Sequence, residues 1–148
     1  MPYRVRPGLG QDMVYLMDID NKCFDDPFTL DDWQVIDHAS RIVVAADVVN
    51  KPAGFICYQS LEGHVFINRL AVHPSLQRRG IATSLVNECK QFCRSVRSLH
   101  VETRIPECWL GSVGPFLKAN GFKAKLPMLT GYHYMGQPTS IVVFDQPM

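Results

Sequence analysis

One segment constrains the fold of this chain more than any other, residues 80–96. Its apolar residues recur at spacings of three and four, the stripe of an amphipathic helix that packs one face against a sheet. Residues 64–72 before it are rich in β-branched and aromatic side chains, and residues 99–104 after it alternate between apolar and polar, so a strand is predicted on each side. A strand, a helix and a second strand form a right-handed crossover between parallel strands. The sequence therefore predicts a βαβ unit at the centre of an α/β fold.

The flanking segments complete this fold with further strands and helices. Thr29 and Asp32 form the N-cap pair of a short helix that runs through Ile36. The segment 109–120 is a weaker helix because two glycines and a proline interrupt it. The other predicted elements are a strand at 3–6, a helix at 13–24, a hairpin of 41–49 and 54–59, and last strands at 122–129 and 140–144, joined by an aromatic, glycine-rich loop at 131–136.

Length and charge limit the class of protein. The chain has 148 residues, of which 47% are hydrophobic and 20% charged, values typical of one globular domain. Its 15 basic and 14 acidic residues give a net charge of +1, which argues against nonspecific binding of nucleic acid. The longest apolar stretch, 42–49, contains Asp47 and is too short to span a bilayer. The first residues lack the apolar core of a signal peptide, so we expect a cytosolic protein.

The cysteines predict packing. The chain has five of them, an odd number with no CxxC spacing, which argues against a disulfide framework. Cys89 and Cys93 lie one helical turn apart, but two thiols alone make a poor metal site. We expect these two thiols in the core and no bound metal.

An anion site is predicted where the central helix begins. The first N–H groups of a helix lack partners inside the helix and lie at the positive end of its dipole. Arg78 and Arg79 add positive charge, Gly80 lets a phosphate approach the backbone, and successive amides from Gln77 to Ala82 are able to wrap a pyrophosphate. The alternative is a helix that starts with surface arginines. The segment is neither a Walker loop nor a GxGxxG fingerprint.

The same segment resembles a family signature. Gln77-Arg78-Arg79-Gly80-Ile81-Ala82 is similar to the Q/R-x-x-G-x-G/A motif that binds acetyl-coenzyme A in the GNAT acetyltransferase superfamily, and it follows the strand end Leu70-Ala71-Val72-His73-Pro74. The order of elements over residues 3–144 also resembles this family. The resemblance implies one domain, residues 1–148, with a mixed, splayed sheet of about seven strands and four helices. Segments 24–28 and 101–104 look nearest to the enzymes that acetylate the N-terminal alanine of ribosomal proteins.

The resemblance also implies where acetyl-coenzyme A binds. The backbone of the strand end would pair with the pantetheine arm, and the N–H of Leu70 or Val72 would polarise the thioester carbonyl. The pyrophosphate would be held by the signature segment. The implied cofactor-binding residues are Leu70, Ala71, Val72, Gln77, Arg78, Arg79, Gly80, Ile81 and Ala82.

The resemblance supplies a base and leaves the acid open. Glu102 matches a catalytic glutamate of the N-terminal acetyltransferases and would act directly or through a water, while the alternative is a solvated carboxylate paired with Arg104. The family's other base position falls at Phe66 and is empty. Leu117 stands where family members carry a tyrosine that acts as the general acid and protonates the departing thiolate. Pro106-Glu107-Cys108 replaces a common asparagine that helps hold the cofactor. Either the thiolate leaves unaided or one of Tyr132, Tyr134 and Cys108 substitutes as the proton donor.

The acceptor amine is the least determined part. In the family, the loop that holds Tyr132 and Tyr134 walls the acceptor groove, where their hydroxyls would hold a peptide backbone, unless they only cover a core edge. Asp25, Asp26 and Phe28 on the facing loop would receive a cationic amine, unless the carboxylates only cap helices. We expect transfer to a peptide or protein N-terminus by direct attack in a ternary complex. The alternatives are a small amine such as a polyamine or aminoglycoside, and a noncatalytic coenzyme A-binding module. A monomer and a homodimer are equally compatible with the sequence.

Overall fold

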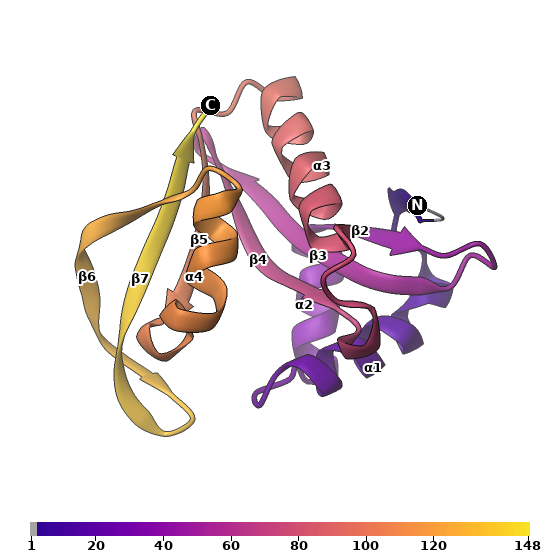
Figure 1. The fold of residues 1–148 in the computed structure, drawn as a ribbon, viewed down its shortest axis with the longest axis horizontal. Coiled ribbons are helices and arrows are strands. Elements are labelled where there is room, and N and C mark those ends of the chain that lie inside the picture. The colour runs from indigo at the N-terminus through magenta and orange to yellow at the C-terminus, as the bar shows by residue number, and fades with distance from the viewer. Residues whose placement is uncertain (1–2) are drawn as a thin grey trace.

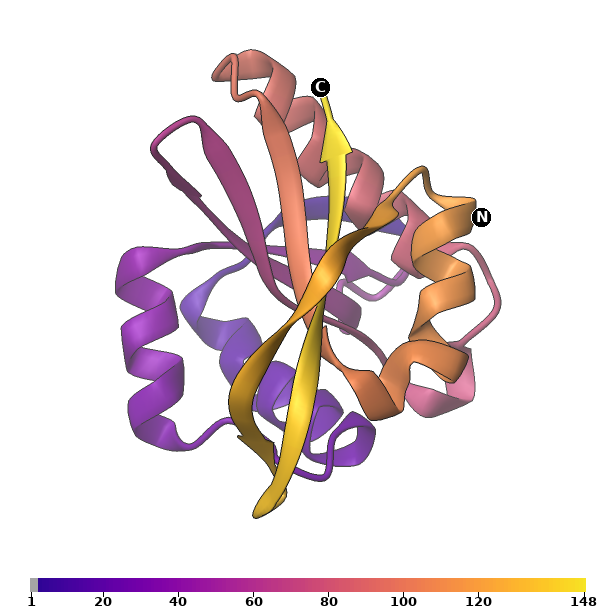
Figure 2. The same ribbon diagram turned by 90° about the vertical axis from the view of Figure 1, so that its left-hand side faces the viewer.

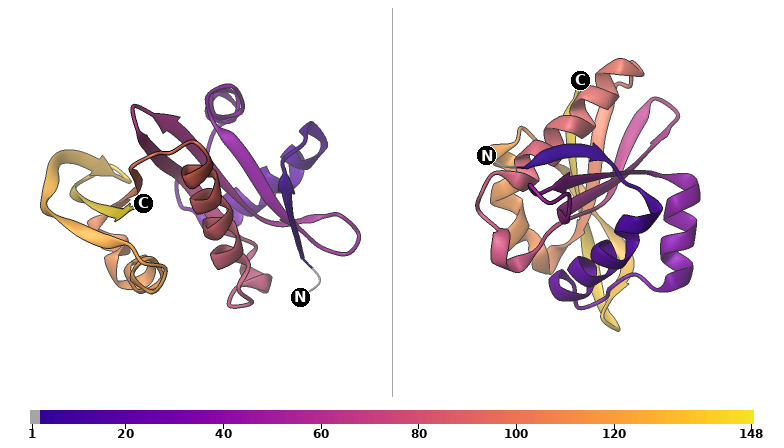
Figure 3. Two further views of the ribbon diagram at one scale, coloured as in Figure 1. Left: turned by 90° about the horizontal axis from the view of Figure 1, so that it is seen from above. Right: turned by 90° about the vertical axis from the view of Figure 1, so that its right-hand side faces the viewer.

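Helices cover both faces of one mixed sheet in the computed structural model, which describes residues 3–148 (Figure 1). The helices α1 (Met13–Cys23) and α2 (Leu30–Ala39) lie on one face. The helices α3 (Ile81–Ser95) and α4 (Leu110–Ala119) lie on the other face. Seen from above, α2 and α3 stand on opposite sides of the sheet (Figure 3, left). In the described residues, no helix has the length and apolar content that crossing a membrane requires.

Within residues 3–148 the sheet has seven strands, in the order β1-β2-β3-β4-β5-β7-β6. All neighbours are antiparallel except β4 and β5, which flank the α3 crossover. The prediction of a mixed sheet with four α-helices and a central βαβ unit is therefore confirmed. The strands are β1 (Arg4–Pro7), β2 (Arg41–Ala46), β3 (Pro52–Leu61), β4 (His64–Val72), β5 (His100–Pro106), β6 (Lys123–Tyr134) and β7 (Gln137–Pro147), and the short 3-10 turns are η1 (Gly10–Asp12), η2 (Pro74–Leu76) and η3 (Glu107–Trp109).

The apolar stripe of α3 forms the centre of the larger core. Leu85, Val86, Cys89 and Cys93 are fully buried there, so the prediction that both thiols pack in the core is confirmed. The start of α3 comes close to the sheet because Gly54 has no side chain. A Cβ at that position would lie 3.3 Å from Cγ2 of Ile81, the first residue of α3, and 2.9 Å from the carbonyl oxygen of Ala71 on β4. This close packing fixes the start of α3 beside the end of β4.

The N-cap of α2 is the predicted one. The Thr29 hydroxyl accepts the N–H of Asp32 at 3.1 Å, and the Asp32 carboxylate accepts the N–H of Thr29 at 2.9 Å. This reciprocal pair satisfies two donors that would otherwise lack partners at the start of the helix.

The last hairpin corrects the sequence prediction. The segment 131–136, expected to be a loop, continues β6 as far as Tyr134, and the strands are joined by Met135 and Gly136 alone. Both residues have positive φ, 54° and 76°, as a two-residue hairpin turn of type I′ requires. A methionine at the first of these positions is not a turn signal, which is why the sequence concealed the turn. Figure 2 shows the resulting long hairpin in gold and yellow.

Candidate active site

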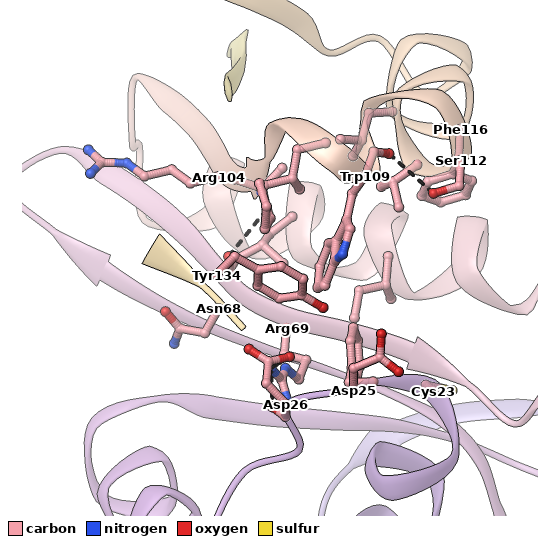
Figure 4. Close-up of a pocket in the computed structure, with 18 of the residues that line it drawn as sticks. Cys23, Asp25, Asp26, Asn68, Arg69, Arg104, Trp109, Ser112, Phe116 and Tyr134 are labelled. Carbon is pink, nitrogen blue, oxygen red and sulfur yellow. Dashed lines mark hydrogen bonds and ion pairs between the residues drawn. The ribbon is translucent and has the colours of Figure 1, made fainter. Parts of the chain in front are cut away.

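A cleft opens where the two parallel strands separate. β4 and β5 pair only from His64 opposite His100 to Ile67 opposite Thr103. Beyond these residues the strands diverge, which leaves the hairpin of β6 and β7 apart from the first four strands (Figure 1; Figure 3, left). A cavity of about 420 Å³ occupies the opening (Figure 4). The splay that the family resemblance implied is therefore present.

A β-bulge lies on β4 at the point of separation. Cys57 of β3 is opposite Arg69, whereas the next residue, Tyr58, is opposite Ile67. Asn68 is therefore an extra residue on β4, and it changes the direction of the strand beside the cavity.

The alternation of the ladder directs backbone groups of β4 into the cleft. His73 donates its N–H to the carbonyl of Ala53 at 2.8 Å, so these two residues form a hydrogen-bonded pair. Bonded and non-bonded pairs alternate along an antiparallel ladder. Counting back from His73, the N–H and C=O of Val72 and Leu70 point away from β3. Within residues 3–148, no strand pairs with them on that side.

The carbonyl of Val72 is already engaged. It accepts the Gln77 side-chain amide at 3.2 Å and the Cys23 thiol at 3.2 Å. The Gln77 side chain therefore ties the turn to β4. Its backbone N–H is the group left for a phosphate.

The turn before α3 has the backbone that an anion site needs. Arg78 and Gly80 both have positive φ, 64° and 80°. Arg78 and Arg79 are exposed, and neither makes an ion pair with any residue of the described chain. Ile81 is 2% exposed, so it offers its N–H and not its side chain, while Ala82 adds little bulk. The free N–H groups of the helix and two uncompensated guanidinium groups favour an anion here.

Glu102 is a buried carboxylate beside the cleft. It is 6% exposed and accepts the Nε–H of Arg104 at 2.9 Å, so it is paired as the alternative interpretation held but is not solvated. Phe66, at the family's other base position, is its register partner on β4. Glu102 lines a second hollow of about 370 Å³. The residues shared by this hollow and the main cavity are Ile67, Asn68, Thr103 and Arg104.

One of the three candidate proton donors lines the cavity. Leu117 is buried in its wall, as the family position implied. Tyr134 also lines the cavity, and burial raises the pKa of its phenol, which keeps it protonated at neutral pH. Tyr132 is 45% exposed, and neither it nor the exposed Cys108 is among the lining residues. Tyr134 therefore lines the cavity itself, Glu102 lines the adjoining hollow, and Tyr132 lines neither.

Acidic and aromatic side chains face each other across the mouth of the cavity. Asp25 and Asp26 come from the loop after α1, and Tyr134 and Trp109 lie opposite them in Figure 4. The centre of the Trp109 ring lies 5.4 Å from the ring centre of Tyr134 and 5.6 Å from that of Phe24. Trp109 was not identified from the sequence because it belongs to no motif there.

Phe28, unlike Asp25 and Asp26, does not line the cavity. Its ring packs edge-on against Trp33 at 5.2 Å and lies 3.7 Å from the Arg69 guanidinium. Arg69 and its partner Asp20 were also missed. Their signal was present in the sequence, since each is a charged residue within an otherwise apolar strand or helix stripe, where burial requires a partner.

Comparison with known proteins now places the chain in a family. A model of the acetyltransferase (GNAT) family matches residues 13–108, well over half of the sequence. The chain belongs to the GNAT acetyltransferase family. No curated protein sequence matches it.

Solved structures with the same fold span nearly the whole chain. Ard1 from Thermoplasma volcanium superposes with a TM-score of 0.87 at 17% identity, covering 100% of this chain and 99% of that chain. The ribosomal-protein-S18-alanine N-acetyltransferase from Escherichia coli gives 0.84 at 12% identity, covering 98% and 93%. NAA60 from Arabidopsis thaliana, in complex with acetyl-CoA, gives 0.81 at 17%, covering 99% and 98%. At these identities the likeness shows the fold.

The cleft suits the acyl donor of this family. Acetyl-CoA carries a diphosphate, which matches the basic turn at the start of α3, and an amide-containing arm, which matches the unpaired backbone groups at the end of β4. The chain is therefore an acetyl-CoA-dependent N-acetyltransferase.

Proposed function

We propose that this enzyme acetylates the N-terminal amine of a peptide or protein, by direct attack of that amine in a ternary complex. One observation carries the proposal. The hollow that holds Glu102 and the cavity for the acyl donor share the residues at which β4 and β5 part. A base in this hollow is therefore separated from the proposed thioester site only by the residues that both hollows share.

The backbone of β4 supplies the electrophilic assistance. We assign the N–H of Leu70, with that of Val72 as the neighbouring candidate, to the thioester carbonyl oxygen. Both groups are directed into the cleft and lack a strand partner there within residues 3–148. A fixed N–H stabilises the negative charge that develops on this oxygen during attack.

Glu102 is the proposed base, and its task is modest. An α-amino group has a pKa of about 7.7–8.0, against about 10.4 for a lysine side chain, so little help is needed at neutral pH. Glu102 takes the proton directly or through a water. The hydrogen bond from Arg104 fixes the orientation of its carboxylate.

Tyr134 is the proposed proton donor to the departing thiolate. It lines the cavity as a protonated phenol, whereas Leu117 at the family position has no proton to give. A thiolate whose conjugate thiol has a pKa of about 8.5 is a tolerable leaving group, so this assistance is useful but not essential.

The mouth of the cleft favours a peptide over a small amine. A small cation is best held in a closed acidic pocket, whereas Asp25 and Asp26 are exposed at an open mouth. Their charges attract an ammonium group and leave room for the chain that follows it. The cytosolic location expected from the sequence stays a prediction.

Release of free thiol from acetyl-CoA tests the acceptor. The enzyme is assayed against peptides with varied first residues and against polyamines, with acetyl-CoA binding measured by calorimetry on the same sample. We expect turnover with peptides that depends on the first residue. Turnover with polyamines alone would overturn the proposal, and acetylation of internal lysines in peptides with blocked N-termini would contradict the assignment to the α-amine.

A further inference from the structure

One buried ion pair joins the acceptor side of the cleft to the bulged strand. Arg69, on β4, donates to the Asp20 carboxylate of α1 at 2.8 Å. The Asp20 side chain is 1% exposed, and its other oxygen accepts the N–H of Phe28 at 2.6 Å. Asp20 thus spans from β4 to the loop between α1 and α2.

The guanidinium of Arg69 also contacts both ends of that loop. It lies 4.1 Å from the ring centre of Phe24 and 3.7 Å from that of Phe28. It donates to the backbone carbonyl of Asp26 at 3.4 Å and approaches the Asp26 carboxylate at 3.8 Å. Planar stacking between two rings suits arginine and not lysine. A single side chain therefore holds the segment that carries Asp25.

The position of Arg69 on β4 couples this loop to the reaction centre. Arg69 follows the bulge residue Asn68, whose side-chain amide donates to the Ser40 hydroxyl at the end of α2 at 2.8 Å. It precedes Leu70, whose N–H points into the cleft. Two consecutive side chains thus tie the bulge to α1, to α2 and to the loop between them.

We propose that Arg69 is a positioning residue for the acceptor: paired with Asp20, it holds Phe24, Asp25 and Asp26 at a fixed distance from the thioester site. The Arg69 side chain makes its hydrogen bonds and ion pairs with Asp20 and Asp26 and none with the donor turn before α3, so its effect should fall on the acceptor and spare acetyl-CoA affinity. The inference rests on the proposed function in that the acceptor amine enters between this loop and Tyr134.

A matched pair elsewhere in the chain serves as control. Arg6 donates to Asp12 at 2.8 and 2.9 Å, and Asp12 accepts the N–H of Leu9 at 2.8 Å. The side chains of Arg6 and Asp12 are 11% and 3% exposed, close to the 10% and 1% of Arg69 and Asp20. This second pair joins β1 to η1, and neither of its residues lines the cavity.

The test compares Arg69→Met, Arg69→Lys and Arg6→Met with the unmodified enzyme. Arg69→Met leaves a buried carboxylate without its cation, so we expect kcat/KM for the acceptor to fall by about tenfold to a hundredfold. The Kd for acetyl-CoA should stay within about twofold. Arg69→Lys keeps the charge but not the stacking, so its kcat/KM for the acceptor should lie between those of the unmodified enzyme and Arg69→Met. Arg6→Met should lower the free energy of unfolding without changing the acceptor kcat/KM or the Kd for acetyl-CoA.

Two results would overturn the inference. One is an acceptor kcat/KM in Arg69→Met that changes no more than in Arg6→Met. The other is a parallel loss of acetyl-CoA affinity, which would indicate general damage. Should Arg69→Met not fold, Arg69→Lys and Asp20→Asn carry the same comparison, and hydrogen exchange of the Phe28 amide reports whether the loop is still held. The Arg69 comparison uses whichever amine the unmodified enzyme accepts, so it does not depend on that amine being a peptide. A failure of the peptide proposal would appear only in the acceptor assay.

Discussion

The donor side and the acceptor side of the cleft are built from different materials. The donor side consists of backbone groups and charges within one stretch of chain, residues 70–82. The acceptor side consists of side chains from four distant segments, which contribute Asp25, Arg69, Glu102 and Tyr134. A ligand with a constant diphosphate and amide arm can be bound by a short backbone motif, whereas an acceptor must be selected by side chains that only the fold brings together.

The two sides also differ in charge. Seven of the 14 acidic residues lie between positions 18 and 37, where Lys22 is the one basic residue, and they are Asp18, Asp20, Asp25, Asp26, Asp31, Asp32 and Asp37. The donor turn instead carries Arg78 and Arg79, which lack an ion-pair partner within residues 3–148. One side therefore favours a cation and the other an anion.

The largest effect should follow from placing a negative charge in the donor turn. Gly80→Glu puts a carboxylate where we expect the diphosphate, so acetyl-CoA affinity should fall by more than about a hundredfold. The control is Gly80→Ala. Nothing lies within 4 Å of a Cβ at this position, and only the positive φ of 80° opposes it, which costs about 1–2 kcal/mol. Calorimetry measures the Kd of both variants for acetyl-CoA. An unchanged Kd for Gly80→Glu would exclude this turn as the diphosphate site.

A large effect confined to chemistry should follow from Glu102→Gln. The amide keeps the shape and can still accept from Arg104, but it cannot take a proton. We expect kcat at neutral pH to fall by about 10²–10⁴-fold while the Kd for acetyl-CoA is unchanged. Glu107→Gln, an exposed residue just beyond the end of β5, is the matched control. Full activity of Glu102→Gln across the pH range would exclude Glu102 as the base.

A smaller effect should separate the two tyrosines of β6. Tyr134→Phe removes the phenol from the cavity wall, and kcat should fall by about tenfold because the thiolate leaves more slowly without a donor. Tyr132→Phe changes an exposed residue on the same strand and should leave the rate unaltered. Equal losses of kcat in the two variants would mean that the substitutions disturb the hairpin, and that Tyr134 does not act as a proton donor in the cavity.

The same contrast explains what the sequence could predict. The bounds of β4 and α3 follow from local periodicity, and the donor turn follows from residues adjacent in sequence. Tyr134 could not be separated from Tyr132, because its position depends on a two-residue turn at Met135 and Gly136 that has no turn signature. Trp109 reaches the cavity only because β5 diverges from β4. Side-chain sites assembled across a splayed sheet depend on tertiary geometry, which local patterns do not encode.

The smallest effect on activity is expected at the buried pair remote from the cleft. The hydrogen bond from Arg6 lowers the pKa of Asp12. A carboxyl whose pKa is lower in the folded state stabilises the fold above its unfolded pKa of about 3.9, and this contribution is lost as the pH falls through the folded value. Asp12→Asn should therefore cost about 1–3 kcal/mol of unfolding free energy at pH 7 and make stability less sensitive to acid below about pH 4. Urea unfolding at pH 7 and pH 3 measures this change, and thiol release should be unaltered. If Asp12→Asn slowed acceptor turnover as much as Asp20→Asn, burial of an ion pair and not its place beside the cleft would be what activity depends on.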